Sequence, residues 1–258
     1  MNLGEWIRCH AYTHGFTCDA CRGELFDYYP RRLCDSCLQK LHTNDSRTCP
    51  KCGRHTVALG VCLACKNRMP KYTKGFSPFV YRGETARLIN SMKNGARRLT
   101  FFFGERMGEC VLQALDRWNG ADRVAINEDS ALIVYVPISK KRRRERGYNQ
   151  AEELAVSFHQ TLAKAGLTVS ICKDAITLNR DMQSQKELQK GDRAKNVKGA
   201  YHIKHRAACK NKMVFLIDDI MTTGATGSEC ADALVRAGAK AVFFITAASL
   251  EEEVEENS

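Results

Sequence analysis

The sequence lacks any hydrophobic run long enough to cross a membrane. Its apolar runs, such as 213–217 and 241–245, are short, whereas a membrane-spanning helix needs about 20 residues. Residues 1–10 also lack the basic segment, apolar core and cleavage site that are typical of an export signal. We therefore expect no membrane span and a cytoplasmic location.

Acidic residues are also scarce relative to basic ones. The chain has 29 Asp and Glu against 40 Lys and Arg, which gives a net charge of +11. An excess of this size favours a polyanionic partner, either nucleic acid or a phosphorylated small molecule. Charge alone does not choose between the two. A length of 258 residues suits one α/β domain with a small accessory module.

Cysteine, in contrast, is abundant, with thirteen in the chain. Eight of them form four Cys-x-x-Cys pairs, and without an export signal this pattern favours metal binding over disulfides. Eight thiolates make two closed tetrahedral sites, so we predict two structural zinc ions. We favour sequential zinc ribbons over a cross-braced arrangement, although the spacing fits both. The ligands would be Cys18, Cys21, Cys34, Cys37, Cys49, Cys52, Cys62 and Cys65.

Cysteine density falls sharply near residue 66, which indicates a domain boundary. We predict a cysteine-rich double zinc ribbon at 1–69 and a connector with helices that packs on the core at 70–130. The core would occupy 131–250, followed by a solvated acidic tail at 251–258.

Helices and strands are expected to alternate after residue 80. Apolar periodicity predicts helices at 84–92, 105–118, 150–163 and 226–237, and strands at 131–136, within 169–178, at 213–217 and at 241–247. The stretch 69–79 is predicted to be a connector, 139–147 a basic loop and 179–196 a long mobile loop. This alternation is typical of an α/β fold with a doubly wound, mostly parallel sheet.

The most specific motif spans 214–226. An apolar strand leads to Asp218 and Asp219, and a small-residue turn then opens a helix. The turn offers backbone N–H groups and hydroxyls for a phosphate, while the two acids suit the hydroxyls of a sugar. Together they predict a ribose 5-phosphate site, with a capped turn and solvated acids as the plainer alternative. The turn residues are Thr222, Thr223, Gly224, Ala225 and Thr226.

This motif resembles the phosphoribosyl pyrophosphate signature of type I phosphoribosyltransferases. The rest of the chain is similar to the ComF/GntX family of competence-associated proteins, which combine that fold with an N-terminal double zinc ribbon. The likeness rests on the cysteine pairs and on several motifs in the same order: 79–83, 136–138, 146–150, 184–185, Leu188, Arg193 and 196–201.

The resemblance implies a reaction in which pyrophosphate is displaced from the ribose with Mg²⁺ present. The basic segment would hold the pyrophosphate through Lys140, Arg142, Arg146 and Gly147, and the loop at 180–196 would close over the centre. Asp218, Asp219 and Arg146 would be the catalytic residues. Thr222 stands where purine-salvage relatives have an acid, which disfavours a purine acceptor, and glutamine use is doubtful.

A second function stays open at this stage. The resemblance also implies a role in DNA uptake and natural transformation, with the competence machinery as partner. The protein could then be a non-enzymatic single-stranded DNA-binding protein, with the zinc module and basic segment on the DNA and the pocket as sensor or scaffold. The acid pair and threonine-rich turn favour the small ligand, whereas the charge of +11 favours the nucleic acid.

Overall fold

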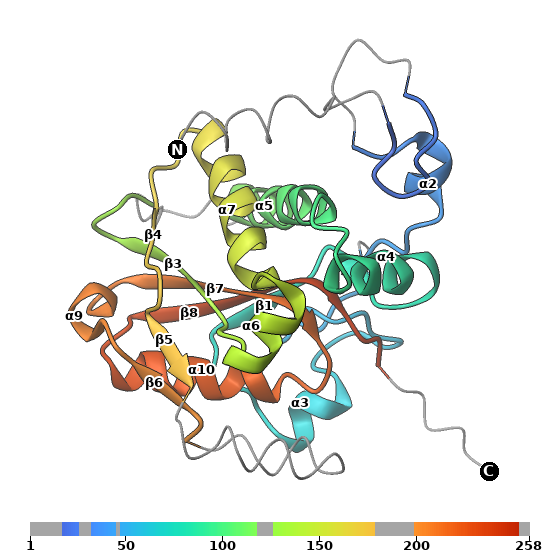
Figure 1. The fold of residues 1–258 in the computed structure, drawn as a ribbon. Helices are drawn as coiled ribbons and strands as arrows, with labels where there is room; N and C mark the ends of the chain where they lie inside the picture. Colours follow the sequence, from blue (N-terminus) through green and yellow to red (C-terminus); the bar gives the residue numbers. More distant parts are fainter. Residues whose placement is uncertain (1–16, 26–31, 45–46, 118–125, 179–198, 253–258) are drawn as a thin grey trace, which may run out of the picture.

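A parallel β-sheet forms the centre of the protein in the computed structural model, which describes residues 17–25, 32–44, 47–117, 126–178 and 199–252 (Figure 1). The strand order is β1-β8-β7-β3-β4, β2 also pairs with β8, and every pairing in this sheet is parallel. The strands are β1 (Lys74–Phe76), β2 (Phe79–Val80), β3 (Ala131–Tyr135), β4 (Ser170–Ile171), β7 (Met213–Met221) and β8 (Ala241–Ser249). A separate antiparallel pair is formed by β5 (Ile176–Leu178) and β6 (Tyr201–Ile203).

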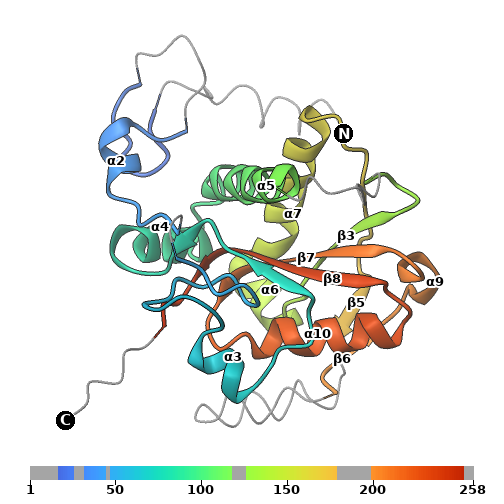
Figure 2. The same ribbon diagram turned by 180° about the vertical axis from the view of Figure 1, so that it is seen from behind.

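Helices cover both faces of this sheet. Helices α5 (Leu99–Arg117) and α7 (Gln150–Lys164) lie on one face and α10 (Ala225–Arg236) on the other (Figures 1 and 2). Helix α4 (Gly83–Lys93) packs on α5. The short helices are α2 (Asp35–Gln39), α3 (Leu63–Asn67), α6 (Lys140–Arg146) and α9 (Arg206–Cys209). The predicted α/β fold with a doubly wound parallel sheet is confirmed.

Successive side chains of the strands point into two separate cores. On β3, Leu132 and Val134 belong to the core on the α10 face, and Ile133 to the core on the α5 and α7 face. This is the two-residue period of an extended strand with both faces buried. The cysteines divide in the same way, because Cys18 and Cys37 join the α5 core while Cys49 and its three partners join the α10 core.

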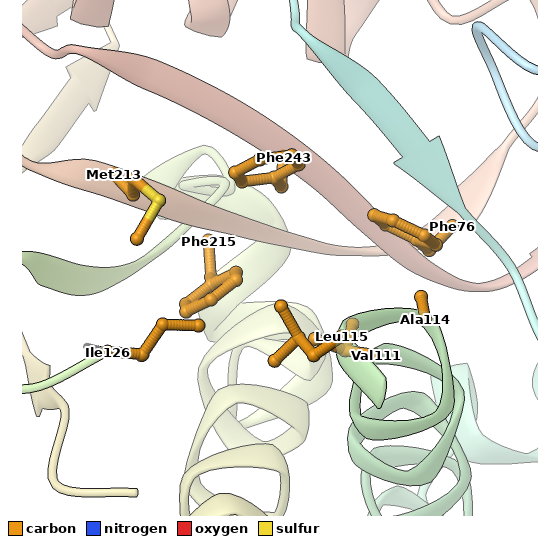
Figure 3. Close-up of a pocket in the computed structure, with 8 residues that line it drawn as sticks. All are labelled: Phe76, Val111, Ala114, Leu115, Ile126, Met213, Phe215 and Phe243. Carbon is orange, nitrogen blue, oxygen red and sulfur yellow. The ribbon is translucent and has the colours of Figure 1, made fainter. Parts of the chain in front are cut away.

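The α5 face is closed by apolar packing. A cavity of about 20 Å³ remains between α5 and the sheet, and Figure 3 shows only apolar side chains around it. They are Phe76, Val111, Ala114, Leu115, Ile126, Met213, Phe215 and Phe243. With no polar group to bind a ligand, this space is a packing gap in the core.

Two predicted irregular segments form regular structure. The predicted basic loop is helix α6, which begins after Ser139, whose side chain accepts from the N–H of Arg142 (3.2 Å), and ends at Gly147 with φ 79°. Lys, Arg and Glu are good helix formers, so a capped run of them favours a helix. The predicted connector at 69–79 contains β1 and the first residue of β2, both paired with β8.

Some boundaries also differ from the prediction. Helix α5 begins six residues before the expected start at Glu105, since Leu99, Phe102 and Phe103 are buried in the same core. Gly104 lies within this helix where α7 packs closely against it. A Cβ atom at this position would lie 2.6 Å from Ser157 Cβ, so glycine permits the close approach. The predicted strand within 169–178 is two short strands, and β7 continues past Ile217 to Met221. The predicted loop at 179–196 lies outside the described residues.

The start of the predicted acidic tail is held by the rest of the protein. Glu251 forms an ion pair with Arg82 (3.2 Å), and the Glu252 side chain accepts a hydrogen bond from the N–H of Leu63 (2.7 Å). These two residues of the predicted tail are therefore tied to the protein surface through exposed groups, while 253–258 lie outside the described residues. None of the helices in the described parts of the chain is both long and apolar enough to span a membrane.

Candidate functional site

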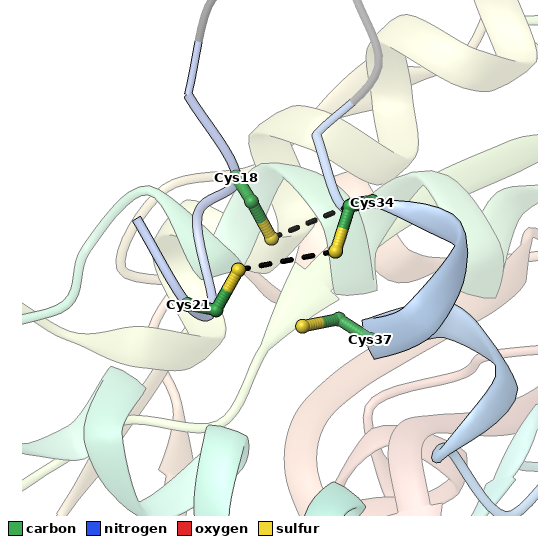
Figure 4. Close-up of side chains that lie close together, drawn as sticks. All are labelled: Cys18, Cys21, Cys34 and Cys37. Carbon is green, nitrogen blue, oxygen red and sulfur yellow. Dashed lines mark hydrogen bonds between the residues drawn. The ribbon is translucent and has the colours of Figure 1, made fainter. Parts of the chain in front are cut away.

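The eight paired cysteines gather into two groups of four, each built from consecutive pairs. Within each group the sulfur atoms all lie within 4.8 Å of one another. Figure 4 shows the first group, with its four sulfurs turned toward a common centre. The predicted sequential arrangement is confirmed, and the cross-braced alternative is wrong. The groups are Cys18, Cys21, Cys34 and Cys37, and Cys49, Cys52, Cys62 and Cys65.

The spacing of these sulfurs fits a tetrahedral metal. A zinc–sulfur bond of about 2.3 Å places two ligand sulfurs about 3.8 Å apart. The distance from Cys21 Sγ to Cys34 Sγ is 3.9 Å, and that from Cys52 Sγ to Cys62 Sγ is 3.6 Å. With four sulfurs each, both groups match a closed structural site, which has no open position for a substrate.

Backbone N–H groups prepare the first cysteine of each group for metal binding. The N–H of Cys34 lies 3.4 Å from Cys18 Sγ, and the N–H of Cys62 lies 3.4 Å from Cys49 Sγ. Burial opposes ionisation of Cys18 and Cys49, but hydrogen bonds from several backbone N–H groups, first those of Cys21 and Cys52, outweigh it and lower the pKa of each to about 7. A thiolate, the form that binds metal, is therefore favoured.

The acid pair lies near the carboxyl end of the central strand β7. Pairing between β3 and β7 ends at Ile217, and β7 continues beside β8 alone. Asp218 and Asp219 therefore follow the point where the neighbouring strand has ended. In open α/β sheets, ligands bind outside the carboxyl ends of the strands.

The two carboxylates have different surroundings. Burial and then the charge of Asp219 raise the pKa of Asp218 above its ordinary value, although the N–H of Asp219 (2.8 Å from Asp218 Oδ1) and the charge of Lys93 act against this. Lys93 Nζ, at the end of α4, lies 3.2 Å from Asp219 Oδ2. Both partners of this ion pair are less than a quarter exposed.

The turn after the acids has the shape of an anion site. Gly224 has φ 75°, and a side chain added there would approach the Tyr72 hydroxyl at 3.2 Å, so glycine is needed for both reasons. Helix α10 begins directly after it. Thr222 and Thr223 are exposed, and Thr226 is half-buried in the first turn of α10. Free N–H groups at such a helix start attract phosphate.

The second cysteine group packs against this turn. Arg54 is 8% exposed, and its Nη2 donates to the carbonyl oxygen of Thr222 at 3.0 Å. Burial would lower the pKa of Arg54, but a hydrogen bond to Cys52 and the neighbouring thiolate charges raise it overall. The Tyr72 hydroxyl also contacts Met221 Sδ at 3.5 Å.

The basic residues of α6 stand mostly in solvent. Lys140, Arg142 and Gly147 are exposed, whereas Arg146 is half-buried and its Nη1 donates to Gln150 Oε1 at 3.0 Å. Arg143 pairs with Glu152 of α7 (3.1 Å). The helix therefore presents a cationic surface, from which Arg143 and Arg146 contact α7.

Of the tyrosines near the basic segments, Tyr148 is unsuited to stacking on a base. It is 7% exposed, and its hydroxyl donates to the buried carbonyl of Met92. Tyr28 and Tyr29 lie outside the described residues. Tyr201 of β6 is hydrogen-bonded to Thr226, and burial, then the charges of Cys230 and Asp218, raise its pKa. Tyr201 thus stands beside the turn and the acid pair.

Sequence reasoning did not identify three residues at this site: Lys93, Arg54 and Tyr201. Each comes from an element distant in the chain, as with Arg54, which is 168 positions from its partner Thr222. No local pattern connects such residues. Arg54 lies in the sequence between the Cys49/Cys52 and Cys62/Cys65 pairs, which is not unusual for an arginine. Its burial is unusual, but only the structure reveals it.

No family model matches the chain. It is 27% identical over 211 residues to the DNA utilization protein YhgH of Escherichia coli strain K12, covering 81% of this chain and 87% of that protein. It is 27% identical over 223 residues to the competence protein ComFC of Bacillus subtilis, covering 80% and 79%. It is 25% identical over 235 residues to competence protein F of Haemophilus influenzae, covering 88% and 94%.

Among solved structures, the chain matches a hypoxanthine-guanine phosphoribosyltransferase from Schistosoma mansoni. The TM-score is 0.28 at 15% identity, over 56% of this chain and 53% of that chain, and so weak a likeness carries no argument. The sequence matches cover most of each protein. The chain is thus a distant homologue of the competence proteins ComFC and F and of the DNA utilization protein YhgH.

Proposed function

We propose that the protein binds phosphoribosyl pyrophosphate at the carboxyl end of β7 and transfers the phosphoribosyl group with release of pyrophosphate. One observation carries the proposal. The acid pair leads into a left-handed glycine turn that opens α10, beyond the point where β3 has ended. An anion site therefore directly follows two acceptors for sugar hydroxyls.

In this proposal the turn from Thr222 to Thr226 holds the 5-phosphate through backbone N–H groups and hydroxyls. Asp218 and Asp219 accept hydrogen bonds from the ribose hydroxyls. Arg146, with Lys140 and Arg142, faces the pyrophosphate, to which guanidinium groups are well suited. Charge develops on the sugar and on the leaving group, so the chain would act by positioning and electrostatics rather than through a covalent nucleophile.

Two metals have separate roles in the proposal. Zinc in each cysteine group is structural, because four sulfurs close the site and a small module gains folding energy from metal binding. Mg²⁺ bound with the substrate supplies charge neutralisation of the leaving pyrophosphate. Oxygen ligands suit Mg²⁺, and the acid pair offers them next to the turn.

Single-stranded DNA is the second candidate ligand, and the exposed cations of α6 favour it. The names of the relatives point to competence and DNA utilization, which supports a role in DNA uptake and natural transformation together with the competence machinery. The two ligands are compatible, because the same helix could face either polyanion. A purely DNA-binding protein would use the pocket as a sensor or scaffold.

Isothermal titration of phosphoribosyl pyrophosphate with Mg²⁺ tests the proposal. We expect Asp218→Ala and Asp219→Ala each to weaken binding about tenfold or more, since hydrogen bonds to charged groups contribute about 1.5–3 kcal/mol. Asp232→Ala, which removes an acid farther along α10, is the matched control and should bind like the parent. Unchanged isotherms for both acid-pair variants would remove the assignment. Pyrophosphate release with candidate acceptors then tests transfer.

A further inference from the structure

We propose that Arg54 is a positioning residue through which the second cysteine group, Cys49 to Cys65, sets the conformation of the phosphate-binding turn. The inference rests on the proposed function of that turn. It assigns the N-terminal module a part in ligand binding beyond its own folding. Arg54 touches no substrate in this proposal, since it acts through the backbone of Thr222.

The first step is the placement of Arg54 between the two parts. Its Nη2 donates to the Thr222 carbonyl at 3.0 Å, and its charge interacts with the thiolates of the second group, that of Cys52 first. Four thiolates around one divalent ion leave a net negative charge, and a buried cation beside them offsets it. A guanidinium can serve both partners at once because its donors form a rigid planar fork.

The second step concerns the peptide unit between Thr222 and Thr223. It is trans, as are all the described peptide bonds, so its carbonyl and its N–H point in opposite directions. Fixing the carbonyl on Arg54 therefore turns the N–H of Thr223 away from the cysteine group. This N–H immediately precedes Gly224, where the chain enters α10, and an anion site needs such donors to be fixed before the ligand arrives.

Other hydrogen bonds connect the segments next to the module and the turn. The N–H of Lys71 donates to Ser228 Oγ at 3.0 Å in the first turn of α10. The N–H of Leu250 donates to the carbonyl of Met221 at 3.0 Å, and that of Glu252 to the carbonyl of His55 at 3.0 Å. The chain after the second group thus contacts α10 at Ser228, and the segment after β8 contacts both Met221, just before the turn, and His55 of the second group.

The first cysteine group provides an internal contrast. It packs on the opposite face of the sheet, where Asp19 lies 3.8 Å from Arg32, and Arg32 lies over the ring of Phe101 at 4.6 Å. Asp19 also lies 4.0 Å from Arg98, directly before α5, so this group contacts α5 on the side of the sheet opposite to α10. The proposal therefore predicts that only the second group affects the turn.

The test combines binding, zinc content and amide exchange on the full chain. We expect Arg54→Met to keep two zinc ions by native mass spectrometry and to weaken phosphoribosyl pyrophosphate binding about tenfold or more by titration. Hydrogen–deuterium exchange of residues 221–227 without ligand should accelerate. Arg54→Lys, which keeps the charge and one donor, should restore part of the affinity. Arg47→Met is the matched control, because Arg47 donates to a carbonyl within the module itself, that of Val57 (3.2 Å).

The outcomes separate this proposal from the proposed function. If the parent does not bind phosphoribosyl pyrophosphate, the proposed function fails, and faster exchange in Arg54→Met still supports positioning. If both Arg54 variants exchange at the same rate as the parent, the positioning role is overturned. It is also overturned if the parent binds the ligand and Arg54→Met exchanges faster but binds with the same affinity. If Arg54→Met loses zinc, the test moves to Arg54→Lys. Two retained zinc ions with faster exchange of residues 221–227 in that variant support the proposal.

Discussion

Lys93 at the end of α4 places its ammonium nitrogen 3.2 Å from a carboxylate oxygen of Asp219 near the end of β7. A helix and the central strand are thus joined by a charge pair at the candidate ligand site. The cation offsets part of the repulsion between Asp219 and its neighbour Asp218, which lies within the same buried corner. This pair explains how two adjacent acids are tolerated before any ligand is bound.

Lys93→Met should destabilise the protein without ligand. Methionine keeps the length and helix preference of lysine but leaves the acid pair without its cation. Removing one partner of a half-buried pair costs on the order of 1 kcal/mol, which lowers the melting temperature by about 2–4 °C in a domain of this size. Thermal unfolding at pH 7.5 measures it, with Lys66→Met on α3 as an exposed control. Equal melting temperatures for parent and Lys93→Met would contradict the expectation.

Asp218→Asn should stabilise the protein in a pH-dependent way. Burial and the charge of Asp219 raise the pKa of Asp218 in the folded state. The folded chain therefore keeps a proton that the unfolded chain has lost, and the stability from this group is present at low pH and disappears as pH rises through the raised pKa. Asparagine does not ionise and so avoids this loss. We expect a higher melting temperature than the parent at about pH 9, a smaller gain at about pH 6, and little difference at about pH 4, near the ordinary pKa of Asp. A gain that grows as pH falls would have the wrong sign.

Each cysteine group should hold one zinc ion independently. Native mass spectrometry of the reduced parent should give two zinc ions, and Cys18→Ser or Cys49→Ser should each give one, because the sulfur groups are separate and lie on opposite faces of the sheet. Cys110→Ser, which is outside both groups, is the control and should keep two. Loss of both ions in either variant would show that the sites are coupled. Within the N-terminal module, Cys49→Ser should unfold mainly the part around the second group.

Single-stranded DNA should bind weakly, without sequence preference and with strong salt dependence. Each neutralised phosphate on a single strand contributes about −0.7 to the slope of log K against log salt. Replacing Lys141, Arg142, Arg143 and Arg144 with Ala should reduce both the affinity and the slope, as fluorescence anisotropy at several salt concentrations would show. Phosphoribosyl pyrophosphate with Mg²⁺ should compete if α6 serves both ligands. Salt-independent binding, or none at low ionic strength, would remove DNA from the proposal.

The sequence was sufficient for features that depend on short-range patterns. The cysteine pairs, the strand with the acid pair and the turn into α10 are contiguous, so their residue types reveal them directly. The sequence was insufficient where distant segments meet. The sequence predicts a basic loop at 139–147, yet the caps at Ser139 and Gly147 make it a helix. Lys93 and Arg54 reach the site from α4 and from the module, segments far from β7 in the chain, and no local spacing encodes such contacts.

The pairing of β1 with β8 bears on how the chain folds during synthesis. Lys74 to Phe76 of β1 lie beside Phe243 to Ile245 of β8, so β1 cannot pair until β8 has been synthesised. Contacts of such long sequence separation slow folding, since a large loop must close before they form. The cysteine groups are local and can acquire metal while the chain is still emerging. The module would therefore mature early, and the sheet with its candidate ligand site would be completed only once β8 has been made.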